Sequence, residues 1–285
     1  MRRNCGSVLG SIFFLFKWRS GIINQNLEFA YHGHSSDRIA LRKNIFRSAY
    51  QHFGQLVFEI IMLFGSMKYY VEHYSRLYGF ENLLKAKKNG KGVVFLSSHV
   101  GNWEIMAARG ALSGMDLMIV TKHLKPEWLH HAVESGRKKC FVSGAYEPKT
   151  MRSILSHLKK NGTVGIVLDQ YAGPPIGVRV PFFGVPVGTS TALAMIVKRT
   201  GAIVLPVVNY RTTSGGVNVE IQPALEWESG GNQAEELAIN TALYVSVLEQ
   251  HICRYPEQWL WIHRRFKGDL SPLHENEWTE GRSRN

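Results

Sequence analysis

From residue 93 onward, short apolar runs rich in β-branched residues alternate with longer segments whose apolar residues recur at helical spacing. The short runs predict strands at residues 93–97, 117–121, 163–168, 203–208 and 217–221. The longer segments predict helices at residues 103–112, 126–137, 149–160, 189–199 and 233–254. This alternation predicts an α/β fold with a mixed, largely parallel sheet flanked by helices, in which ligands gather beyond the carboxyl ends of the strands.

The first part of the chain has a different pattern. Residues 38–78 carry apolar side chains at helical spacing and no proline, which predicts two helices of mixed apolar and basic character. Residues 8–16 read VLGSIFFLF between basic residues, a run too short for the roughly 20 residues that cross a bilayer. We expect an interfacial anchor with Trp18 at headgroup level, and an ordinary buried helix is the alternative. The predicted organisation is a helical membrane-associating segment (1–75), a main domain (76–270) and a polar tail (271–285).

Charge narrows the classes of partner. The chain has 34 Lys and Arg against 22 Asp and Glu, a formal charge of +12, so its field attracts nucleic acid, anionic lipid or an acidic carrier protein. No nucleic-acid-binding motif accompanies the charge, so we expect no nucleic-acid partner. Cys5, Cys140 and Cys253 are far apart and form no CxxC pair, which argues against a disulfide framework and a thiolate zinc site. A reduced compartment facing the cytoplasm follows.

The segment VVFLSSHVGNWEIMAARG carries the first candidate chemistry. An apolar strand is followed at once by His99, and Glu104 comes five positions later at a predicted helix start. Transfer of an acyl group to an alcohol needs a base for the hydroxyl proton, and a carboxylate can orient the imidazole and stabilise its charged form. The alternative is structural: Asn102 caps the helix, Glu104 is a favourable first-turn acid and His99 is a loop residue.

Several segments in a fixed order then carry a resemblance. They are the H-x4-E box at His99 and Glu104, the pair Gly136-Arg137, the strand end LDQYAGP with Asp169, VPFFG at 180–184, the stretch KRTGAIVLPV and the closing PEQWLWIHRRFK. In order and spacing, from about Asn26 to Lys267, the chain resembles the lipid A biosynthesis (lauroyl and myristoyl) acyltransferases, within the lysophospholipid acyltransferase superfamily.

The resemblance implies a glycerolipid acyltransferase-like fold at the cytoplasmic face of the inner membrane, an acyl-acyl carrier protein donor, and no metal or other cofactor. It implies His99 as general base, Glu104 as its catalytic partner, and Arg137 and Asp169 as further site residues, with Arg137 on an acceptor phosphate. Arg264 and Arg265 are candidates for holding the carrier protein or acceptor phosphates, and a solvated basic helix end is the alternative.

Two departures from the family pattern bear on these expectations. The transmembrane helix that usually begins the family is mostly missing, and the box DQYAGP has no second acidic residue after Asp169. The first concerns anchoring, and the second concerns the choice of acceptor or donor more than the type of reaction.

The predicted function is O-acylation of a lipid A precursor or related envelope glycolipid, by a general-base mechanism without a covalent enzyme intermediate. Acylation of a lysophospholipid or a phosphatidylinositol mannoside, with acyl-CoA or acyl carrier protein as donor, is the nearest alternative. A non-catalytic protein that binds anionic membranes is a further one.

Overall fold

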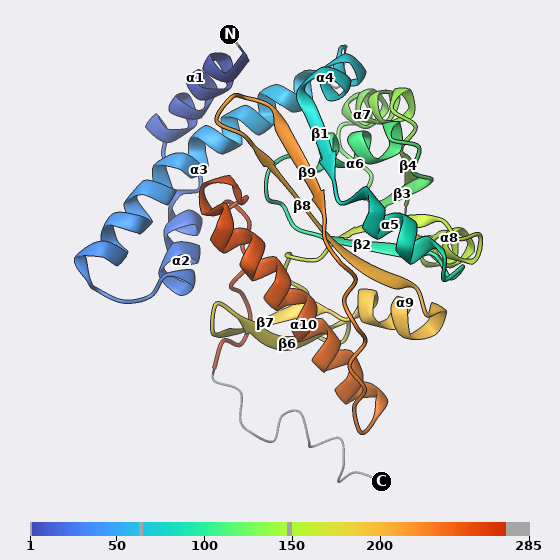
Figure 1. Cartoon of the computed structure of the whole chain (residues 1–285). Coiled ribbons are helices and arrows are strands. Elements are labelled where there is room, and N and C mark those ends of the chain that lie inside the picture. Colours follow the sequence, from blue (N-terminus) through green and yellow to red (C-terminus); the bar gives the residue numbers. More distant parts are fainter. Residues whose placement is uncertain (1, 63–64, 147–149, 272–285) are drawn as a thin grey trace.

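The computed structural model describes residues 2–62, 65–146 and 150–271 (Figure 1). These residues form a seven-stranded sheet in the order β1-β9-β8-β2-β5-β3-β4 and a separate hairpin, β6-β7. The strands are β1 (Ser75–Tyr78), β2 (Val93–Ser97), β3 (Leu117–Val120), β4 (Ser143–Ala145), β5 (Thr163–Val167), β6 (Gly177–Phe182), β7 (Val185–Ser190), β8 (Ile203–Arg211) and β9 (Val217–Ile221). Neighbouring strands of the large sheet are parallel, except that β8 and β9 pair antiparallel.

The helices precede, connect and follow these strands. They are α1 (Arg2–Leu15), α2 (Ser20–Ala30), α3 (Ser36–Met62), α4 (Met67–Tyr74), α5 (Phe80–Lys87), α6 (Trp103–Leu112), α7 (Glu127–Lys139), α8 (Thr150–Lys159), α9 (Ala192–Thr200), α10 (Gln233–Arg254) and the short 3-10 helix η1 (Pro256–Gln258). The expected α/β class, with a mixed and mostly parallel sheet, is confirmed.

Strand β2 is the centre of the sheet, and all five of its residues are buried. Because side chains alternate between the two faces of a strand, Val93 and Phe95 enter one core and Val94 and Leu96 enter another. The first core packs against α4 to α7, and the second against α8 to α10. Burial on both faces explains why β2 reads as a continuous apolar run in the sequence.

The N-terminal helices pack against the segment that follows α10 (Figure 1). A third core joins residues of α2 and α3, such as Leu27 and Tyr50, to the β6-β7 hairpin and to Trp261 and Phe266. The Asn26 amide donates hydrogen bonds to the carbonyl oxygens of Trp261 (2.6 Å) and His263 (2.7 Å). The segment expected to associate with the membrane therefore also packs against the main domain and shares a hydrophobic core with it.

Helix α1 lies against α3 through three glycines. A Cβ atom on Gly54 would lie 2.2 Å from the backbone N of Gly10 and 2.4 Å from the carbonyl oxygen of Gly6.

No helix of the described residues is both long and apolar enough to cross a membrane.

Most predicted elements are found, with shifted ends in several cases. Strands 93–97 and 217–221 and helices 103–112 and 233–254 have the expected bounds. Two differences follow from strand pairing. The helix expected from 189 begins at Ala192, because residues 185–190 pair with β6 as a strand. Residues 75–78, expected within the second helix, instead form a strand that pairs with β9. The elements α5, β4 and the β6-β7 hairpin were not predicted. Residues 272–285 of the expected tail lie outside the described residues.

We expect Gly54→Ala to lower the free energy of unfolding by about 1–3 kcal/mol, because the added methyl group forces α1 away from α3. Urea denaturation measures this, and limited proteolysis should show earlier cleavage within α1. Gly21→Ala in α2 is the control, since nothing lies within 4 Å of its Cβ position. Equal stability of the two variants would contradict the close α1-α3 packing.

Candidate active site

His99 and Asp169 meet because two neighbouring parallel strands end in register. Ser97 at the end of β2 pairs with Val167 at the end of β5, and His99 and Asp169 each come two residues later. The His99 Nδ1 atom lies 2.7 Å from Asp169 Oδ1, and the His99 backbone N–H donates to Asp169 Oδ2 at 2.8 Å. The two strands thus deliver an imidazole and a carboxylate to one point at the carboxyl edge of the sheet.

The buried Asp169 carboxylate has a third donor, the Trp259 indole N–H, at 2.7 Å from Oδ2. Burial alone raises the pKa of Asp169, but the charge and hydrogen bond of His99, with the bond from Trp259, bring it well below its usual range. An ionised carboxylate can only accept a hydrogen bond here, so His99 Nδ1 carries the proton and the lone pair is left on His99 Nε2. Gln170 Nε2 lies 3.5 Å from that atom.

Glu104 has a different partner from the one expected. Its carboxylate accepts two hydrogen bonds from Arg137, at 3.0 Å from Nε and 2.6 Å from Nη2, and both side chains are about 7% exposed. Burial lowers the pKa of Arg137, but the bonds and charge of Glu104 outweigh it and raise the pKa further. Asp169, not Glu104, is therefore the carboxylate in contact with His99, because Glu104 lies on the inner side of α6 facing α7.

Arg137 is held on a second side as well. Its Nη1 donates to Glu134 at 2.9 Å and lies within 3.4 Å of the Tyr146 hydroxyl. The guanidinium is buried and its charge is balanced by two carboxylates.

The backbone after His99 is held by Asn102 and Asn209. Asn102 caps α6, accepting hydrogen bonds from the backbone N–H groups of Glu104 (3.0 Å) and Ile105 (3.3 Å), as the structural alternative expected. Gly101 has a φ of +68°, and a Cβ there would lie 2.3 Å from Asn209 Oδ1. The loop therefore needs glycine at this position.

The closing segment PEQWLWIHRRFK supplies residues that the sequence did not single out. Trp259 pairs with Val100 in an isolated bridge, and the Leu260 backbone N–H donates to the His99 carbonyl at 3.2 Å. The ring of His263 lies 5.3 Å from that of His99, and burial, with the nearby His99, lowers the pKa of His263 to about 4. The motif PEQWLWIHRRFK in the family resemblance indicated that this region matters. Only the fold shows that Trp259 and His263 lie beside His99 and Asp169.

Arg264 and Arg265 are adjacent in sequence but have opposite environments. Arg264 is exposed. Arg265 is 1% exposed, and its Nη1 donates to the carbonyl oxygens of Gln170 (3.0 Å) and Gly188 (2.9 Å), while its Nη2 donates to Thr189 Oγ1 (2.7 Å). Burial lowers the pKa of Arg265 to about 10, so its guanidinium stays charged at neutral pH and joins the loop after β5 to β7.

Two cavities of opposite character adjoin His99. One, of about 460 Å³, is lined by His99 and mainly by apolar residues of the sheet and α6, among them Phe95, Met106 and Leu117. The other, of about 570 Å³, is lined by Arg19, Ile22, Gln170, Tyr171, His263, Arg264 and Lys267. Gln170 and His263 line both cavities.

The second cavity is strongly basic. No carboxylate of the described residues forms an ion pair with Arg19, Arg264 or Lys267, and no acidic side chain is among the lining residues. Arg19 enters from the N-terminal helices, where its Nη1 donates to the Ile262 carbonyl at 3.1 Å. The arrangement can hold a long apolar chain on one side of the imidazole and an anionic group on the other.

Comparisons with known proteins agree with this chemistry. The family model of the bacterial lipid A biosynthesis acyltransferases matches residues 1–268. The lipid A biosynthesis palmitoleoyltransferase of Escherichia coli is 27% identical over 257 residues, covering 88% of this chain and 79% of that protein. The lauroyltransferase of the same organism is 25% identical over 270 residues (93% and 84%). A phosphatidylinositol mannoside acyltransferase of Mycolicibacterium smegmatis is 24% identical over 196 residues (67% and 62%).

We expect Arg265→Met to lower the free energy of unfolding by about 2–4 kcal/mol, because three buried oxygens lose a charged donor. Arg264→Met is the matched control and should unfold within about 0.5 kcal/mol of the wild type, since its side chain is exposed. Urea denaturation of both variants measures the difference. An equal loss in free energy of unfolding for Arg265→Met and Arg264→Met would contradict the different environments of the two side chains.

Proposed function

The chain belongs to the bacterial lipid A biosynthesis acyltransferase family, and on that premise we propose that it moves a fatty acyl chain from acyl carrier protein to a hydroxyl of a lipid A precursor or related envelope glycolipid. The observation that carries this proposal is the contact between His99 and Asp169 beside an apolar and a basic cavity. Acyl transfer uses all three features.

The reaction begins when His99 Nε2 takes the proton of the acceptor hydroxyl. At the same time the hydroxyl oxygen attacks the carbonyl carbon of the thioester. Asp169 holds the imidazole in the required tautomer and stabilises the imidazolium that forms. When the tetrahedral intermediate collapses, the C–S bond breaks and the thiolate leaves. The imidazolium returns the proton to the thiolate, so the enzyme ends in its starting state.

The two cavities divide the substrates by polarity. The apolar cavity takes the acyl chain, which gains free energy by leaving water. In the basic cavity, Arg264, with Arg19 and Lys267, binds a phosphate of the acceptor or of the carrier's prosthetic arm.

Arg137 and Arg265 are assigned positioning roles, since their guanidinium groups are buried and bonded to protein oxygens. Arg137 orders Glu104 at the start of α6, and Arg265 orders the loop that carries Asp169 and Gln170. Arg137 also lines the apolar cavity beside His99, so its expected contact with an acceptor stays a prediction, whereas Arg265 lines neither of the two cavities.

The membrane surface is the proposed working place, at the cytoplasmic face of the inner membrane. Val8, Leu15 and Phe16 of the first helical segment are 61%, 76% and 81% exposed, and Trp18 and the basic Lys17 follow them. This combination favours insertion of apolar side chains among headgroups with cations against anionic lipid. Lipid acceptors reside there.

A different acceptor is the second candidate. The likeness to a phosphatidylinositol mannoside acyltransferase, together with the missing second acid after Asp169, supports acylation of another envelope lipid by the same chemistry. A lysophospholipid acceptor and acyl-CoA as donor remain within this alternative.

Total-lipid mass spectrometry of a deletion strain tests the proposal. We expect one glycolipid to lose the mass of an acyl chain and to regain it with the wild type, whereas His99→Ala and Asp169→Asn restore it at rates about 10²-fold lower or worse. His34→Ala, at an exposed histidine, is the control and should restore it fully. Full restoration by the first two variants would remove the general-base mechanism. A change confined to non-glycosylated phospholipids would favour the second candidate.

A further inference from the structure

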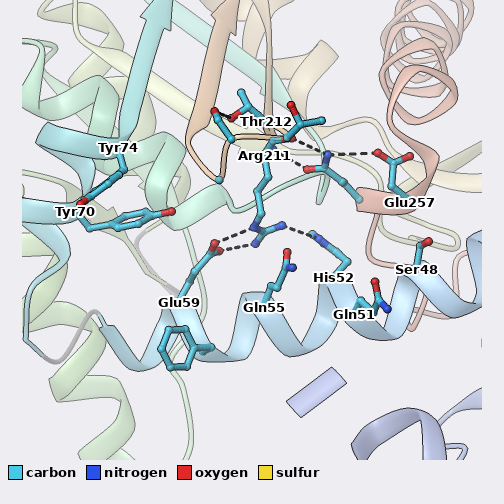
Figure 2. A pocket seen from close by; sticks show the side chains of 15 residues that line it. Ser48, Gln51, His52, Gln55, Glu59, Tyr70, Tyr74, Arg211, Thr212 and Glu257 are labelled. Carbon is cyan, nitrogen blue, oxygen red and sulfur yellow. Dashed lines mark hydrogen bonds and ion pairs between the residues drawn. The ribbon is translucent and has the colours of Figure 1, made fainter. Parts of the chain in front are cut away.

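A third cavity, of about 640 Å³, is not part of the chemistry described above. It lies between α3, α4 and the turn that joins β8 to β9, and shares no lining residue with the two cavities beside His99. Figure 2 shows His52, Gln55 and Glu59 pointing from α3 toward Arg211 at the end of β8.

Arg211, the cation in the lining of this cavity, is already neutralised by a carboxylate. Arg211 donates to both oxygens of Glu59, at 2.8 Å from Nε to Oε1 and from Nη2 to Oε2, in a pair about one-tenth exposed. Glu257 is the remaining carboxylate in the lining, and no unpaired cation is among the lining residues that the structure describes. An anionic ligand would therefore find no free positive charge there.

His52 contributes a buried donor. Arg211 Nη1 lies 2.8 Å from His52 Nδ1, and because a guanidinium only donates, Nδ1 must accept. The neutral imidazole then carries its proton on Nε2, consistent with a pKa held well below its usual range by burial and by Arg211. This Nε2–H has no acceptor among the described residues, although His52 is only 4% exposed. Because the Nε2 atom is itself buried, it does not meet a ligand directly, and His52 contributes an uncharged ring to the lining.

The same face of α3 presents further polar groups. Ser48, Gln51 and Gln55 follow helical spacing, line the cavity, and form no side-chain hydrogen bond with another residue in the described part of the chain. Across from them lie Thr212 and Ser214 of the β8-β9 turn, and Phe58 adds an apolar surface. Groups that both donate and accept, beside an aromatic ring and without net positive charge, match the hydroxyls and the apolar face of a sugar ring.

The floor of the cavity is bonded to the loop that carries His99. Glu59 Oε2 accepts from Asn102 Nδ2 at 2.7 Å, and Asn102 caps α6 directly after His99 and Gly101. Gln258 joins the other side: its Oε1 accepts from the Arg211 backbone N–H at 2.7 Å, and its carbonyl accepts from Gly101 N–H at 2.9 Å. A ligand here would lie on groups that hold the catalytic loop.

We propose that this cavity binds an uncharged saccharide ring. The ring is either a glycosyl unit of the lipid acceptor or a separate sugar, and it bonds to the amides of Gln51 and Gln55. Only the first of these two sources rests on the proposed function, since binding of a sugar does not require acyl transfer.

Saturation-transfer NMR on the full chain tests the inference, with maltose, cellobiose and diacetylchitobiose as neutral probes and with phosphate and choline as charged ones. We expect transfer to the ring protons of at least one disaccharide, reduced at least five-fold in the double variant Gln51→Leu/Gln55→Leu. Gln250→Leu, at an exposed position of α10 outside the cavity, is the matched control and should leave the transfer unchanged. If the double variant does not fold, Gln51→Leu alone serves, because Gln51 is exposed.

Absence of transfer to every disaccharide, equal transfer in the wild type and the variant, or competition by phosphate or choline would overturn the proposal. The kinetics of the variant then separate the two sources. A KM for a glycolipid acceptor raised five-fold or more at unchanged kcat identifies the acceptor's own sugar, whereas an unchanged KM with lost disaccharide binding identifies a separate saccharide. Because the NMR signal needs no turnover, a failure of the acyltransferase proposal would leave this result intact.

Discussion

The buried carboxylate of Asp169 is the group on which the arrangement of the site depends. A charge placed in the interior is costly unless hydrogen bonds and an opposite charge replace its hydration. Here the donors come from two distant parts of the chain, the loop after β2 through His99 and the closing segment through Trp259. These hydrogen bonds stabilise the buried charge of Asp169. The bond from His99 Nδ1 also fixes the orientation of the imidazole.

The buried carboxylate of Glu104 is stabilised in a similar way, by a partner of opposite charge. Glu104 pairs with Arg137, which also pairs with Glu134, and neither carboxylate contacts the His99–Asp169 pair. Glu104 is committed at both oxygens and is not free to orient His99 as well. Its place at the start of α6, beside the Asn102 cap, makes it part of the support that holds the loop carrying the base.

Residues of the N-terminal helices meet the closing segment beside this site. Asn26 and Arg19 bond to the backbone of residues 261–263, which places a basic side chain from the N-terminal helices in the cavity beside His99. A segment that the sequence predicts as a membrane anchor therefore also helps to form the substrate cavity. The segment proposed to contact the membrane and the cavity proposed to bind substrate thus share residues of the N-terminal helices.

The periodicity of the sequence was sufficient for elements with strong patterns, such as β2 and α6, but not for the hairpin at 177–190, where glycine and proline interrupt the pattern. His99 was a candidate from its place after a predicted strand, and Asp169 was one from the family resemblance. Their contact follows from β2 and β5 being neighbours, and the alternation of elements does not set strand order. The H-x4-E box, supported by the family resemblance, favoured Glu104, which follows His99 by five positions, whereas Asp169 follows it by seventy. Arg264 and Arg265 look equivalent in sequence, and only packing separates an exposed cation from a buried one.

The most direct test of the central claim is the NMR signal of the proton on His99 Nδ1, observed in protein labelled with ¹⁵N-histidine. A hydrogen bond to an ionised, buried carboxylate shifts such a proton far downfield and protects it from exchange. The structure predicts that the signal is present in the wild type and in Glu104→Gln and is lost in Asp169→Asn. Its loss in Glu104→Gln with retention in Asp169→Asn would contradict the pairing and return Glu104 to the role that the sequence suggested.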